Sequence, residues 1–242
     1  MPDRWRQQRH FPPTRLSIVS ALGDDDDDTR RRAADLLARA YWGPLATTLR
    51  LRWRLEPADA EDMTQEFFGE ALSKDWFTKY DPARARFRTF LRVCLDRFAA
   101  NALQSNRRLK RGGGAAMVPL DDAYALPAGD DDDADARFRQ EWVRSVFSLA
   151  LEAFRDEAVA AGKGVHVELF EAYDVADAPD GERPSYRDLG ARHGLAETTV
   201  TNHLAWARRT FRRHVLDVLR SLAGSEAEFR EDAQDLLGVR PT

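Results

Sequence analysis

The clearest indication of the fold is the stretch of residues 185–209, which reads SYRDLGARHGLAETTVTNHLAWARR. Ser185 is placed to cap a short helix in which Leu189 faces inward. Gly190 leaves the space that a close crossing of two helices requires, and Gly194 stands where a sharp turn needs a left-handed backbone. The apolar residues that follow recur at helical spacing along one face of a long second helix: Val200, Leu204, Ala207, Phe211, Val215 and Leu219. The stretch therefore predicts a helix-turn-helix.

The polar face of that second helix suits duplex DNA. Short polar side chains near a helix N-terminus fit base edges in the major groove, and the arginines further along fit phosphates. For Trp206 two alternatives stay open, because it is as well placed to pack on a neighbouring helix as to touch DNA. His203 has no partner ligands near it in sequence, so we expect no metal there. The candidate DNA-binding residues are Thr198, Thr199, Thr201, Asn202, His203, Trp206, Arg208 and Arg209.

The rest of the chain also has the spacing of helices. Apolar residues recur at helical intervals in segments 30–40, 45–51, 59–72, 87–98 and 138–154. We expect Thr29 to cap the first segment, Gly43-Pro44 to interrupt it, and Asp59 to cap the third. No segment shows the alternation of a strand with comparable strength. The sequence therefore predicts an all-α fold.

Charge is distributed unevenly along the 242 residues, although the net charge is only -4. Residues 30–111 carry 18 basic and 10 acidic side chains, and residues 185–223 carry 7 and 3. Residues 130–184 between them carry 6 basic and 15 acidic side chains. Basic blocks in an acidic protein indicate local contact with a polyanion, most often nucleic acid. Two solvated helical surfaces are the alternative.

Composition also divides the chain into five segments. Lys110 to Gly114 forms a breakpoint, and the run Asp130 to Asp133 lacks the spaced ligands of a calcium loop, so we interpret it as solvated linker. We predict an N-terminal extension (1–29), a helical domain (30–111), a flexible acidic linker (112–140), a helix-turn-helix domain (141–222) and an acidic C-terminal tail (223–242). Within the tail, Phe229, Leu236 and Leu237 suggest a small helix.

Several classes of protein are disfavoured by the composition. The mean hydropathy is -0.57 and there is no run of about 20 apolar residues, so no membrane helix is expected. Residues 1–10 are basic with no apolar stretch behind them, unlike a secretory signal. A single cysteine excludes an internal disulfide framework and a cysteine-based metal cluster. We therefore expect a soluble, cytoplasmic protein without membrane contact.

An acidic helix followed by a basic one marks the N-terminal half. Residues 56–68 are rich in carboxylates, and Asp62 and Glu66 lie four residues apart on one helix face. Residues 83–91 then read ARARFRTFL, a basic and aromatic stretch of the kind that holds unpaired nucleic acid. The carboxylates suit a basic protein partner, or are an ordinary solvated helix N-terminus. No nucleophile accompanies them in sequence, so we predict no enzyme.

Together and in this order, these motifs resemble bacterial RNA polymerase sigma factors of the extracytoplasmic-function (ECF) group. Residues 59–66 resemble the core-binding helix of region two, residues 87–91 its strand-separating helix, and residues 185–209 resemble region four. The resemblance covers residues 30–111 and 141–222.

The resemblance implies two helical domains, a sigma region 2 bundle and a sigma region 4 helix-turn-helix, joined by the acidic linker. It implies a cytoplasmic specificity subunit without cofactor or catalysis, which directs core RNA polymerase to promoter DNA and helps to melt it in transcription initiation. An anti-sigma factor or another regulator is a further candidate partner. The residues implied for core polymerase are Asp59, Glu61, Asp62, Gln65 and Glu66. Those implied for the minus-ten element are Arg84, Arg86, Arg88, Phe90, Arg92, Arg97, Arg107 and Arg108, and the helix from Glu197 would read the minus-thirty-five element.

The sequence departs from the family pattern at several positions. Phe90 stands where the family usually has tryptophan, and core packing and base stacking both stay open for it. Arg97 and Asn101 stand where the family often has asparagine and aspartate. The linker is longer and more acidic than usual, and because opposite charges attract within about a Debye length, we expect it to cover the basic segments before polymerase binds.

Two other functions remain as alternatives. One is a free-standing helix-turn-helix transcriptional regulator, whose N-terminal bundle dimerises or senses a ligand and which binds its operator without polymerase. The other is an interaction protein that resembles a sigma factor but sequesters a regulator.

Overall fold

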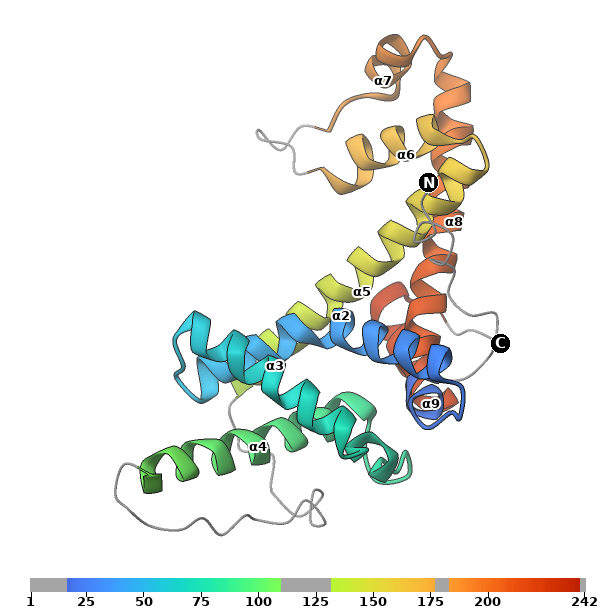
Figure 1. Cartoon of the computed structure of the whole chain (residues 1–242). Helices are drawn as coiled ribbons and strands as arrows, with labels where there is room; N and C mark the ends of the chain where they lie inside the picture. The colour runs from blue at the N-terminus through green and yellow to red at the C-terminus, as the bar shows by residue number, and fades with distance from the viewer. Residues whose placement is uncertain (1–16, 110–131, 177–182, 240–242) are drawn as a thin grey trace, which may run out of the picture. The chain divides into compact units, whose positions relative to one another are not determined.

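The computed structural model describes residues 17–109, 132–176 and 183–239 (Figure 1), and every regular element in these ranges is helical. The prediction of an all-α fold is confirmed for this part of the chain. Packing divides the chain into two units, which are described separately. The large unit contains the described residues up to Val146 and from Leu219 onward, and the small unit contains those of Phe147–Val218. Both boundaries fall inside long helices, α5 (Asp132–Ala160) and α8 (Glu197–Leu222).

The large unit is built on aromatic side chains. Helix α3 packs on α2 and α4, while α1 packs on α2 and on the short helix η1. Tyr41, Phe87 and Phe90 are fully buried and joined by ring contacts, and the buried Phe67 lies edge-on to Phe68 and Phe98. The elements are α1 (Ile18–Leu22), α2 (Asp27–Arg52), α3 (Pro57–Ser73), η1 (Trp76–Lys79), α4 (Phe87–Leu109), the first half of α5, the last turn of α8, and α9 (Glu226–Leu237).

Helix α2 differs from the sequence prediction at two points. It starts at Asp27, and its N-cap is Asp26 rather than Thr29, because the Asp26 carboxylate accepts from the Thr29 amide at 2.8 Å. It also continues through Pro44, where a break was predicted. Pro44 lacks an N–H and costs a helix interior about 3 kcal/mol. Burial of Leu45 and Leu49 beyond it offsets that loss.

The predicted inner face of α4 is confirmed, since Phe87, Leu91, Cys94 and Phe98 are all buried. Burial raises the pKa of the Cys94 thiol to about 12, which keeps it protonated and unreactive. The tail was predicted to form a small helix, and α9 confirms it, with Phe229 buried. Of the predicted linker, residues 112–131 lie outside the described residues, and residues 132–140 form the first turns of α5.

In the small unit, two helices joined by a turn stand where the helix-turn-helix was predicted. Ser185 caps α7 (Tyr186–His193) in a reciprocal capping box with Asp188. Gly194 ends α7 with φ 65°, ψ 31°, and α8 follows as the second helix. The second half of α5, α6 (Gly164–Phe170) and the π-helical turn η3 (Glu171–Val175) complete the unit. Its core contains Phe154, Ala158, Val167, Leu169, Phe170, Leu189, Val200, Leu204 and Ala207.

None of the described helices combines the length and the apolar character that crossing a membrane requires. Within the same described ranges, no group of three or more His, Cys, Asp or Glu side chains is arranged to hold a metal ion.

Candidate functional site

The acidic face of α3 is open to solvent. Pro57 starts the helix at a position that tolerates proline, and Asp59 lies in the first turn, where the helix dipole favours a negative charge. The opposite face carries Phe67 and Phe68, which are buried and fix the orientation of the helix. All five candidate polymerase-binding residues are exposed, and none forms an ion pair or side-chain hydrogen bond within the described ranges: Asp59, Glu61, Asp62, Gln65 and Glu66.

Arg88, the first arginine inside α4, is not open to solvent. Its guanidinium donates to both carboxylate oxygens of Asp232 at 2.7 Å and lies 5.0 Å from the ring centroid of Trp142. Burial alone would lower the pKa of Arg88, but the charge and hydrogen bonds of Asp232 outweigh that effect and raise it. Arg88 is therefore a permanently charged group held by a buried carboxylate.

Other candidate minus-ten residues are also engaged within the large unit. Arg86 pairs with Glu231 and Asp232 of α9, and Arg92, which is buried, pairs with Asp135 of α5. Among the remaining candidates, Arg97 is buried and Arg84 is exposed, while the side chains of Arg107 and Arg108, at the end of α4, lie outside those that the structure describes.

Phe90 is packed in the core. Its side chain is 1% exposed, and its ring lies 5.4 Å from that of Tyr80 and 6.4 Å from that of Phe87. Of the two alternatives for Phe90, core packing and base stacking, the structure shows core packing. Stacking on a base would require the ring to leave this cluster.

Helix α8 presents a polar row to solvent. Thr198, Thr201, Asn202 and Arg209 are exposed, and because the last three follow Thr198 by three, four and eleven residues, all four lie on one side of the helix. The Thr201 hydroxyl donates to the carbonyl of Glu197 at 3.0 Å. Thr199 is half-buried. This row is the part of α8 available to base edges and phosphates.

Two candidates on α8 face α6 instead. The His203 ring stacks on His166 with centroids 3.8 Å apart and an angle of 23° between the planes. Trp206 lies edge-on to His166 at 5.0 Å, and the Lys163 ammonium lies 4.0 Å from the Trp206 ring centroid. Trp206 thus packs on a neighbouring helix, which was one of the two alternatives. His203, which the sequence places on the polar face of the helix, is half-buried.

Arg208 is exposed but already paired. It donates to the Asp174 carboxylate at 2.8 and 3.1 Å and lies 3.4 Å from the Tyr186 hydroxyl. These hydrogen bonds, Asp174 first, raise the pKa of Arg208. The pair links η3 to α8, so Arg208 must exchange a carboxylate for a phosphate to bind DNA.

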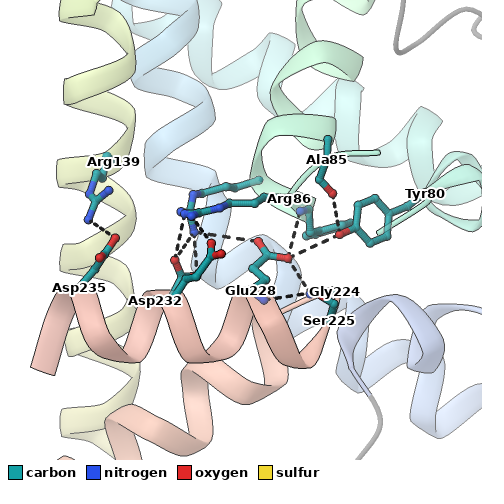
Figure 2. Close-up of polar contacts among 12 residues, drawn as sticks. Tyr80, Ala85, Arg86, Arg139, Gly224, Ser225, Glu228, Asp232 and Asp235 are labelled. Atoms are coloured by element: carbon teal, nitrogen blue, oxygen red, sulfur yellow. Dashed lines mark hydrogen bonds and ion pairs between the residues drawn. The ribbon is translucent and has the colours of Figure 1, made fainter. Parts of the chain in front are cut away.

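The carboxylates of α9 are the functional candidates that sequence reasoning missed. Figure 2 shows Asp232 pointing toward Arg86, Glu228 toward the Tyr80 hydroxyl, and Asp235 toward Arg139. A signal was present, because residues 228, 232 and 235 have the spacing of one helix face. Their partners lie up to 148 residues away along the chain, which no local pattern reveals.

The histidine stack predicts a pH dependence for the small unit. Burial lowers the pKa of His166, and the nearby charges of His203 and Lys163 lower it further. The unfolded chain therefore binds more protons than the folded one below the ordinary histidine value of 6.5, and the free energy of unfolding falls as the pH drops through that range. We expect NMR of labelled histidine to show His166 titrating below 6.5. His166→Gln should reduce the dependence of stability on pH between pH 5 and 7 without removing it, because burial also lowers the pKa of His214. A midpoint above 6.5 would contradict this.

Comparisons with family models, curated proteins and solved structures gave no match.

Proposed function

We propose that this chain is a sigma factor that directs core RNA polymerase to specific promoters and assists their melting. It would act in the cytoplasm as a non-enzymatic specificity subunit with two functional parts, a region 2-like bundle in the large unit and a region 4-like helix-turn-helix in the small unit. The observation that carries the proposal is the pairing, in one chain, of an open acidic helix face with a recognition helix whose polar row is exposed.

The acidic face of α3 supports a protein partner. Carboxylates used for intramolecular stability are paired, as Asp232 is with Arg88. By contrast, Asp59, Asp62 and Glu66 have no described partner and cluster on the exposed side of a helix whose other side is anchored in the core. Such a single-sign patch favours a basic partner surface.

The helix-turn-helix supports duplex DNA. Its two helices are fixed by the capping box at Ser185 and the left-handed turn at Gly194, so the exposed row of α8 is held rigidly. Thr198, Asn202 and Arg209 offer short polar groups first and a guanidinium further along, which is the order that base edges and phosphates need.

One observation favours the alternative of a free-standing helix-turn-helix regulator. The recognition row of α8 is open, whereas Arg86, Arg88 and Arg92 of the large unit are held by carboxylates. A chain in this state is better prepared to bind duplex DNA than single strands.

Gel filtration of the purified chain with bacterial core RNA polymerase distinguishes the two. A sigma factor should co-elute stoichiometrically with core and bind duplex DNA weakly alone. A free-standing regulator should elute apart from core and bind its duplex tightly, with an affinity that falls steeply with salt. Elution apart from core would overturn the sigma-factor proposal.

A further inference from the structure

Helix α9 is docked on the start of α4 by apolar and polar contacts together. Phe229 is buried, and a Cβ on Gly224, just before α9, would collide with the ring and hydroxyl of Tyr80. This close approach brings the first turn of α9 against the loop that precedes α4, where the Tyr80 hydroxyl donates to the Ala85 carbonyl at 3.0 Å (Figure 2). The docking is therefore specific in position, not a diffuse attraction of an acidic tail.

Glu228 occupies the place of a helix cap at the N-terminus of α4. One carboxylate oxygen accepts from the Phe87 amide at 3.3 Å and from the Gly224 amide at 2.9 Å. Burial raises the pKa of Glu228, and these two amides oppose that rise. The first amides of a helix are groups that bind anions, and here a carboxylate from α9 holds one of them.

The next carboxylates of α9 hold the two arginines at the same end of α4. Asp232 is bonded to Arg88 through both oxygens, and their side chains are only 6% and 12% exposed. Arg86 pairs with Glu231 and lies 3.5 Å from Asp232. Two guanidinium groups beside a helix N-terminus form a set of donors that phosphate groups also use. In this structure these donors face α9.

The pairing of α9 carboxylates with arginines of other helices continues toward the C-terminal end of α9. Asp235 pairs with Arg139 of α5 at 3.2 Å, as Figure 2 shows. Glu226, in contrast, pairs with Arg230 of α9 itself at 3.4 Å and with Arg220 of α8 at 4.0 Å, and neither partner lies on α4. The carboxylates that face basic residues of α4 and α5 are thus one face of the helix, and Glu226 supplies an internal control.

We infer that α9 is an intramolecular substitute for a nucleic-acid backbone: its carboxylates occupy the anion-binding end of α4, and single-stranded nucleic acid binds there only when α9 is displaced. The inference rests on the proposed function, because it concerns the region assigned to the minus-ten element. It differs from the prediction that the acidic linker covers the basic segments, because the covering element here is α9. The described part of that linker contributes Asp135, which pairs with Arg92 further along α4.

The test compares two full-length variants with the same change in charge. In Glu231→Gln/Asp232→Asn, Arg86 and Arg88 lose their close carboxylates. The buried Arg88 then keeps only the carboxylate of Glu228, at 4.0 Å, and this loss destabilises the docked state of α9. In Asp25→Asn/Glu226→Gln, two exposed carboxylates that do not touch α4 are neutralised. The probe is a fluorescein-labelled single-stranded oligonucleotide of mixed sequence, titrated at several salt concentrations.

We expect the first variant to bind the oligonucleotide about tenfold more tightly than the wild type and the second to match the wild type within about twofold. Equal affinities for both variants would overturn the inference.

Two further measurements keep the outcomes separate. Hydrogen exchange on the wild type should show residues 226–237 losing protection when saturating oligonucleotide is added, and unchanged protection would overturn the inference even if the first variant fails to fold. Co-elution with core polymerase tests the proposed function independently. If the wild type fails to co-elute but α9 is displaced by the oligonucleotide, the sigma-factor proposal fails and the inference about α9 stands. If the wild type co-elutes and α9 stays in place, only the inference about α9 fails.

Discussion

Gly190→Ala is expected to destabilise the small unit by about 3 kcal/mol and to abolish its duplex binding. A Cβ at this position would lie 2.5 Å from the carbonyl oxygen of Leu195, a backbone atom that cannot rotate away. The same two residues are joined by a hydrogen bond from the Leu195 amide to the Gly190 carbonyl at 2.8 Å, so separating them also breaks that bond. Hydrogen exchange of α7 and α8 measures the loss.

Gly69→Ala is the matched control for this change. Gly69 lies inside α3, and nothing stands within 4 Å of the point that a Cβ would occupy there. Because alanine restricts the unfolded chain and favours a helix, we expect the large unit to gain about 0.5–1 kcal/mol. If Gly190→Ala is as harmless as Gly69→Ala, the helix crossing is looser than the structure shows.

Asp62→Lys/Glu66→Lys is expected to weaken binding to core polymerase by about 100-fold or more. Charge pairs at a protein interface each contribute on the order of 1.5 kcal/mol or more, and reversing two of them turns attraction into repulsion. Both side chains are exposed, so the free energy of unfolding should change by less than about 0.5 kcal/mol. Gel-filtration co-elution and a competition titration against core measure the effect.

Asp25→Lys/Asp156→Lys makes the same change in net charge at two exposed positions outside α3. It should co-elute with core as the wild type does, and both double variants should bind duplex DNA equally through α8. Equal loss in both variants would indicate a response to net charge alone. Unaltered affinity in both would count against α3 as the polymerase-binding surface.

The features that the sequence predicted well are those encoded within one helix or one turn. The inner face of α4 repeats every three to four residues, and Ser185 and Gly194 mark the ends of α7 by capping chemistry. These signals need no knowledge of distant residues. The fold class and the helix-turn-helix followed from them.

The features that were missed depend on residues far apart in the chain. Pro44 remains in a helix because residues on both sides of it are buried, which overrides its local preference. Arg88 pairs with Asp232, and His166 stacks on His203, across different helices. The spacing of residues along the chain could not predict these contacts. Of the candidate site, the exposed rows on α3 and α8 were predictable, while the pairing of the arginines on α4 was not.

The pairing of Arg88 with Asp232 also determines when, during synthesis of the chain, the large unit can be completed. The two residues are 144 positions apart, and a ribosome adding about 5–20 residues per second needs about 7–29 s to make the segment between them. Throughout that interval α4 emerges without the carboxylate that caps it and without the partner of its first arginine. The large unit can therefore complete its polar core only late in translation, and the nascent α4 is at its most basic before α9 exists.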